Sequence, residues 1–111
     1  MLSPFGNVSF VLVPTRENGF TDTMAMSFAP FRVGDTSIIC VKNPNRTLTI
    51  ELRGIETYRF IGSLPAACQS LEVEIAMNHN NVVTVALDGV AVGCCEWIQE
   101  SLRDRTAKKK R

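Results

Sequence analysis

The sequence has little charge imbalance and no long apolar run. Its 111 residues carry 12 Lys and Arg against 11 Asp and Glu, a formal net charge of +1, so no overall field draws it to nucleic acid. No run approaches the roughly 20 apolar residues that span a bilayer. The first ten residues lack a basic leader followed by an apolar segment, so we expect no signal peptide. We therefore predict a cytoplasmic protein with neither a nucleic-acid nor a membrane partner.

The four cysteines and the single histidine form no metal-binding pattern. Cys40, Cys68, Cys94 and Cys95 lack the paired C-x-x-C spacing of a zinc site, and His79 stands among asparagines in an expected turn. Three of the cysteines fall in apolar, strand-like contexts, and adjacent Cys94 and Cys95 would point to opposite faces of a strand. We expect free thiols in a reducing compartment, no metal and no cofactor.

Catalytic constellations are also missing. A hydrolytic triad needs a nucleophile, a base and an orienting group, and the only histidine, His79, is expected at a solvent-exposed hairpin tip. Glu72 and Glu74 share one face of one predicted strand, whereas paired catalytic carboxylates usually converge from different elements. The glycines are scattered, and none has the spacing of a phosphate-binding loop. We expect a protein that is not an enzyme. An enzyme would need a cleft assembled from Glu, Cys and His79.

What the sequence does contain is strand patterning, clearest at residues 70–87. Leu71, Val73, Ile75 and Met77 alternate with other residues, as in a strand with one buried face. Four turn-compatible residues, 78–81, follow, and asparagine tolerates the left-handed backbone of tight hairpin turns. The alternation then resumes over residues 83–87. The pattern predicts a β-hairpin.

Similar short patterns precede and follow this hairpin. We expect a buried strand over 8–13 that ends at Pro14, a turn over 15–22, and a strand over 24–28 that ends at Pro30. Residues 31–35 are expected to form a loop, 42–46 another, and 88–89 a turn. Further strands are predicted at 37–41, 47–52, 57–61 and 94–99, with Trp97 and Ile98 as the packing residues of the last one.

This count predicts an all-β fold of about eight antiparallel strands, a β-sandwich or barrel. A parallel α/β sheet is excluded because no crossover helices are visible. We expect one β-domain over residues 1–99, followed by a short helical stub or disordered basic tail over 100–111. The terminal TAKKKR could attract nucleic acid or anionic membrane, but we interpret it as a solvated tail.

The order of elements resembles the peptide-binding domain of the 70-kilodalton heat-shock chaperones. The segments YRFIGSLP, LEVEIAMNHNNVVTVAL and DGVAVG match that family's strand ending in Gly, Pro-containing crossover, long hairpin and last strand. SIICVKNPNRTLTIELRG is similar to its third and fourth strands. The resemblance covers residues 8–99 and is closest from 47 to 93. It implies an antiparallel β-sandwich leading into a lid helix, of which residues 100–107 could form only a stub.

The resemblance implies a module that holds extended apolar polypeptide segments, with no ATPase of its own and a possible partner ATPase domain or chain. Carried over by position, Ile39, Leu48 and Ile50 would line the peptide pocket, with Leu12 as a fourth candidate. The small residue that completes an arch over the peptide in the family falls near Lys42, which departs from the pattern. Ordinary sandwich core is the alternative role for all four apolar residues.

A second function from a different class stays open. An antiparallel β-sandwich also pairs with itself or with a partner through an exposed edge strand. A structural or assembly module that forms homo- or hetero-oligomers is therefore the alternative to peptide binding.

Overall fold

A computed structural model describes residues 7–14, 23–64, 70–78, 80 and 82–98. These residues form nine strands and no helix: β1 (Asn7–Leu12), β2 (Met26–Ser27), β3 (Phe31–Val33), β4 (Thr36–Lys42), β5 (Thr47–Arg53), β6 (Thr57–Ser63), β7 (Leu71–Met77), β8 (Val83–Leu87) and β9 (Val90–Ile98). All pairings are antiparallel. The predicted all-β antiparallel class is confirmed. The expected helical stub, residues 100–111, lies outside the described residues.

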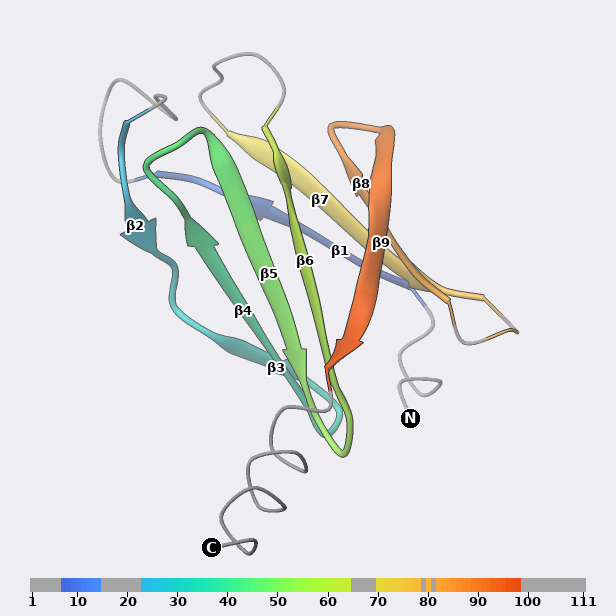
Figure 1. Cartoon of the computed structure of the whole chain (residues 1–111). Coiled ribbons are helices and arrows are strands. Elements are labelled where there is room, and N and C mark those ends of the chain that lie inside the picture. Colours follow the sequence, from blue (N-terminus) through green and yellow to red (C-terminus); the bar gives the residue numbers. More distant parts are fainter. Residues whose placement is uncertain (1–6, 15–22, 65–69, 79, 81, 99–111) are drawn as a thin grey trace, which may run out of the picture.

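The strands form one sheet that curls into a half-barrel (Figure 1). Its order is β1-β7-β8-β9-β6-β5-β4-β2, with β3 beside β4. Strand β9 joins the two halves, because Val90–Cys95 pairs with β8 and Glu96–Ile98 pairs with β6. The path therefore begins at β1 and ends at β2 and β3.

The concave face of the sheet holds the hydrophobic core. Strands β4, β5 and β7 alternate buried and more exposed residues, so every second side chain points inward. In β5, as predicted, the inward residues are Leu48, Ile50 and Leu52, all 0% exposed. Each such side chain contributes about 1.5–3 kcal/mol through burial. The core contains Leu12, Ile38, Cys40, Leu48, Ile50, Leu52, Tyr58, Phe60, Leu64, Leu71, Val73, Ile75, Val83, Val85, Leu87 and Cys95.

The predicted hairpin at residues 70–87 is confirmed as β7 and β8. Met77 pairs with Val83 where the turn begins. The Asn78 side-chain oxygen accepts hydrogen bonds from the backbone N–H groups of Asn80 (2.8 Å) and Val82 (3.1 Å). Asparagine is favoured in such turns because its short side chain reaches the backbone two residues on. His79, placed in this turn by the sequence, lies outside the described residues.

A second tight turn joins β8 to β9, as residues 88–89 predict. Asp88 has φ 52° and Gly89 has φ 83°, the left-handed pair required by a type I′ hairpin turn. The Asp88 carboxylate also accepts a hydrogen bond from the backbone N–H of Glu72 (2.9 Å). The side chain thereby ties the turn to the start of β7.

Strands β6 and β9 pair only over Thr57–Arg59 and Glu96–Ile98 and diverge beyond these residues. Phe60 packs on the inner side of this junction. A Cβ built on Gly62 would lie 2.3 Å from Phe60 Cζ, and one on Gly93 would lie 3.2 Å from Phe60 Cε1. The ring therefore lies against both glycines. An aromatic ring that covers glycines of neighbouring strands replaces their missing side-chain packing.

Several expectations about individual segments are wrong. Residues 31–33 form a strand, β3, and not part of a loop, because Val33 pairs with Thr36 across a two-residue turn at Gly34 (φ 60°). The strand expected over 24–28 is limited to Met26–Ser27. The strand expected to start at residue 94 starts at Val90.

Two predicted packing patterns also differ from the structure. The strand near residues 8–13 is not buried throughout: Val11 is 56% and Val13 60% exposed, because β1 ends the sheet and turns only alternate residues inward. Trp97 is 54% exposed near the end of β9, while Ile98 is half-buried as expected. The predicted opposite orientations of Cys94 (exposed) and Cys95 (buried) are confirmed.

Candidate functional site

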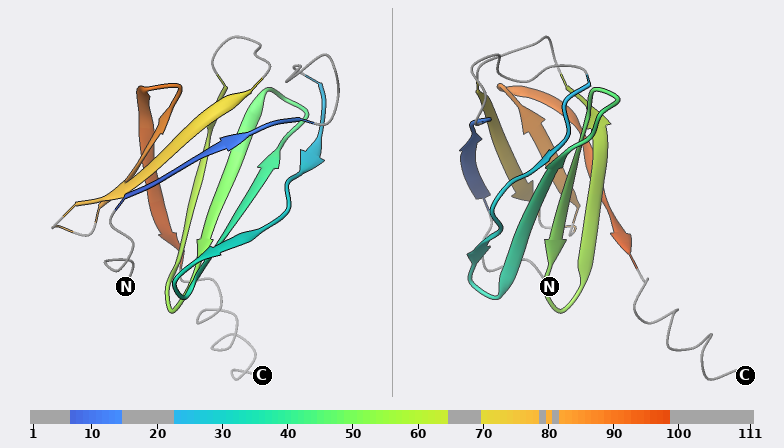
Figure 2. Two further views of the ribbon diagram at one scale, coloured as in Figure 1. Left: turned by 180° about the vertical axis from the view of Figure 1, so that it is seen from behind. Right: turned by 90° about the vertical axis from the view of Figure 1, so that its left-hand side faces the viewer.

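The two ends of the curled sheet approach each other without pairing. The C-terminal end of β1 lies near the segment that links β2 to β3 (Figure 2). At one point the seam is closed by side chains: the rings of Phe10 and Phe31 meet edge to face, with centroids 4.9 Å apart and planes at 72°. Among the described residues, β1 pairs only with β7. Within this part of the chain, its other edge has no strand partner.

An apolar groove runs along this seam beyond the two rings. It has a volume of about 420 Å³ and is lined by Phe10, Val11, Leu12, Val13, Phe28, Ala29 and Phe31. No charged side chain is among them. The exposed valines, Val11 and Val13, give the β1 wall an apolar outer side as well.

The two walls of the groove differ in what their backbones can offer. On the β2–β3 side, the N–H of Phe28 donates to the carbonyl of Cys40 (3.0 Å), and Pro30 has no N–H to donate. Proline is one of the devices that blocks a sheet edge against further pairing. Strand β1 has no proline between Asn7 and Leu12. Backbone pairing with an added strand is therefore available on the β1 side.

In its described residues, the seam has few of the charges that usually protect exposed edges. Sheet edges in monomeric proteins commonly carry Lys or inward-pointing charges that oppose association. Within the described ranges 7–14 and 23–33, the single charged residue is Arg32, which is exposed on β3. An uncharged edge beside an apolar groove is suited to receive an extended segment.

The four predicted peptide-pocket residues do not gather at one site. Leu12 is 5% exposed and lines the groove. Leu48 and Ile50 are 0% exposed and point into the core. Ile39 lies on the opposite, convex face of the sheet, half-buried and opposite Glu51. The sequence missed Val11, although the absence of charge from residue 7 to residue 14 was a usable signal.

Lys42, the residue at the predicted arch position, is fully buried at the end of β4. Its ammonium donates hydrogen bonds to the carbonyl of Met24 (2.9 Å) and to the carbonyl of Asn43. These contacts satisfy a charge that would otherwise be costly to bury. They also hold the segment before β2 against β4. Strand β2 itself pairs with β4 through two residue pairs.

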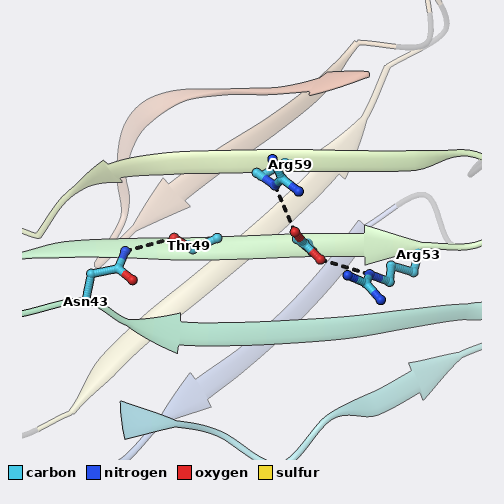
Figure 3. A network of polar contacts seen from close by, with 5 residues as sticks. Asn43, Thr49, Arg53 and Arg59 are labelled. Atoms are coloured by element: carbon cyan, nitrogen blue, oxygen red, sulfur yellow. Dashed lines mark hydrogen bonds and ion pairs between the residues drawn. The ribbon is translucent and has the colours of Figure 1, made fainter. Parts of the chain in front are cut away.

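The convex face of the sheet carries a polar network (Figure 3). Glu51 on β5 accepts hydrogen bonds from Arg53 (2.9 Å) and Arg59 (2.8 Å). Partial burial alone would raise the pKa of Glu51, but the two arginines outweigh it and lower that pKa. At the start of β5, the side-chain amide of Asn43 donates hydrogen bonds to the hydroxyls of Thr47 (3.0 Å) and Thr49 (2.8 Å).

A smaller depression lies where β6 and β9 diverge on this convex face. It has a volume of about 310 Å³ and is lined by Arg59, Ile61, Cys94, Glu96 and Ile98. Its mixed lining of opposite charges and apolar side chains gives it no single chemical character. The exposed thiol of Cys94 is accessible there.

The remaining chemistry of the described residues is limited. Burial raises the pKa of Cys40 to about 12, and burial together with neighbouring Cys94 raises that of Cys95 to about 12, so both are protonated at neutral pH. Cys68 lies outside the described residues. In the described part of the chain no cluster of three or more His, Cys, Asp or Glu could hold a metal ion, and no helix has the length and apolarity to cross a bilayer.

No family model, no curated protein and no solved structure matches the chain.

Proposed function

We propose that the protein binds extended apolar segments of other polypeptides at the groove beside β1. The segment adds as a strand to the free edge of β1 and places alternate side chains in the groove. Backbone hydrogen bonds give such a complex affinity that is largely independent of sequence, while the groove selects apolar side chains. Leu12 is the residue of the predicted pocket set that takes part directly.

The observation that carries the proposal is the coincidence of three properties along one seam. Among the described residues, the edge of β1 is unpaired, every residue that lines the adjoining groove is uncharged, and Val11 and Val13 remain exposed beside it. When a bound segment covers the apolar surface of these valines, the free energy of binding becomes more favourable by about 25 cal/mol for every Å² that is buried. Burial of this surface therefore favours a partner strand.

The resemblance to the heat-shock chaperones agrees with this class of ligand but implies a different site. In our proposal the two halves of the curled sheet act as the two layers of a sandwich that supports the groove, and residues 100–111 supply a short helical stub. The protein holds the segment without hydrolysing ATP itself, and a partner ATPase domain or chain would provide any energy-driven release. We expect dissociation constants in the micromolar range for an open site of this kind.

Fluorescence anisotropy with a labelled heptapeptide of leucine and valine tests the proposal. The substitution Val11→Lys places a charge on the exposed edge of β1, and we expect it to weaken binding by at least tenfold, equivalent to about 1.4 kcal/mol. Val90→Lys is the matched control, because Val90 is similarly exposed (63%) but lies on the β8–β9 hairpin, outside the groove. No saturable binding by the wild type, or equal loss in both variants, would contradict the proposal.

Self-assembly through the same edge is the second candidate function. The free, uncharged edge of β1 also favours it, because two copies can pair β1 with β1 about a two-fold axis. Light scattering over a hundredfold range of concentration separates the two functions. Assembly in place of peptide binding would be established by a dimer with two properties. The Val11→Lys substitution dissociates it, and added heptapeptide leaves it intact.

A further inference from the structure

We propose that Arg32 selects, among the apolar segments that bind at the groove, those carrying an acidic side chain on their outward face. The inference rests on the proposed function and names the class of polypeptide that the site prefers. It starts from the position of Arg32 on β3, directly after a residue of the groove wall.

The contact between Phe31 and Phe10 places the start of β3 next to β1. Their ring centroids are 4.9 Å apart, and both residues line the groove. Because successive side chains of a strand point to opposite faces, Arg32 projects from the outer face while half-buried Phe31 and Val33 point inward. Val11 projects outward from β1 in the same way. Arg32 and Val11 therefore both lie on the outer side of the seam.

Within the described part of the chain, no carboxylate neutralises Arg32. Among the described residues it makes no ion pair or hydrogen bond, in contrast to Arg53 and Arg59, which both bind Glu51. The nearest acidic residue along the chain, Asp35, lies exposed in the turn between β3 and β4 and forms no ion pair with it in this part of the structure. Among the described residues of the seam, Arg32 thus supplies the one charge, and it is positive.

A strand added to β1 has a face that meets this charge. Its inward side chains enter the apolar groove, and its outward side chains lie between the outer faces of β1 and β3. A carboxylate there pairs with the guanidinium through charge-assisted hydrogen bonds, whereas a lysine is repelled. Opposite-charge pairs between neighbouring strands are modest at exposed sites, so we expect about a threefold to fivefold preference for the acidic segment.

The experiment uses a set of leucine- and valine-based heptapeptides in which one Asp or one Lys occupies each position in turn. For the wild type we expect Asp to be preferred over Lys at one outward position, with the preference falling as salt rises. Arg32→Glu is expected to reverse the preference at that position, and Arg32→Gln to abolish it. Arg46→Glu, at an exposed residue of the β4–β5 loop, changes the net charge by the same amount and is expected to leave it intact.

The outcomes separate this inference from the proposed function. Equal affinity for all the peptides, or a preference that Arg32→Glu and Arg46→Glu change alike, overturns the selection by Arg32 and leaves binding at the groove in place. Failure of every peptide to bind the wild type overturns both.

Discussion

Replacing Gly62 with alanine tests how tightly Phe60 closes the junction of β6 and β9. The added Cβ would lie 2.3 Å from Cζ of the Phe60 ring and 3.0 Å from Cε1 and Cε2. The ring is 4% exposed and already lies close to Gly93 on the neighbouring strand β9. It therefore has little room to move. We expect the substitution to displace the ring from a position that packs both strands.

The magnitude follows from two opposing effects. Forcing an extra methyl group into a packed core costs about 1–3 kcal/mol. Restricting the unfolded chain by Gly→Ala returns about 0.4–1 kcal/mol. We therefore expect a net loss of about 1–2 kcal/mol in the free energy of unfolding. For a domain of roughly 100 residues this lowers Tm by about 4–10 °C.

Urea and thermal unfolding followed by circular dichroism measure this loss. Ser63→Ala, at the exposed next residue of β6, is the control and should change stability by less than about 0.5 kcal/mol. The Phe60→Leu background isolates the cause, because a shorter side chain removes the clash and the cost of alanine at Gly62 should shrink. A fully stable Gly62→Ala protein, or the same cost in both backgrounds, would refute the reasoning.

The polar network and the cysteines give two further predictions. The lowered pKa of Glu51 means that its ionised form stabilises the fold at neutral pH and that this contribution is lost as pH falls through the folded-state pKa, below 4.5. Glu51→Gln should therefore cost about 1 kcal/mol in urea unfolding at pH 7 and progressively less below pH 4.5; a difference independent of pH would contradict this. Iodoacetamide at pH 7.5 should modify Cys94 long before Cys40 and Cys95, whose thiols are buried and protonated. Peptide mass mapping checks the order of modification. Equal rates of alkylation for the three cysteines would show that Cys40 and Cys95 are not buried.

The local β-structure was largely predictable because its signals lie within a few neighbouring residues. The alternation in β5 and β7 and the turn residues at 88–89 specify strands and hairpins from nearest-neighbour geometry. The structure follows them closely, from the three inward residues of β5 to the pairing of Met77 with Val83. Where flanking Pro30 and Gly34 suggested a loop, β3 forms because a two-residue turn pairs it with β4.

The candidate site was less predictable because it depends on which strands end the sheet. The apolar run over residues 8–13 looks like a buried strand, and only the strand order shows that β1 is an edge with Val11 exposed. Spacing along the chain likewise did not indicate that Ile39 and Leu48 face opposite sides. Burial of Lys42 depends on a carbonyl 18 residues away, which no local pattern reports.

Pro30 has a consequence for the stoichiometry of any complex formed at the seam. Continuous fibril growth needs two competent edges on every subunit, one to accept a strand and one to be accepted. In our proposal the β1 end of the sheet accepts a strand, whereas the opposite end is interrupted at Pro30, a residue without an N–H group. We expect strand addition at the seam to stop after one segment, so that the apolar edge of β1 gives complexes of defined composition there.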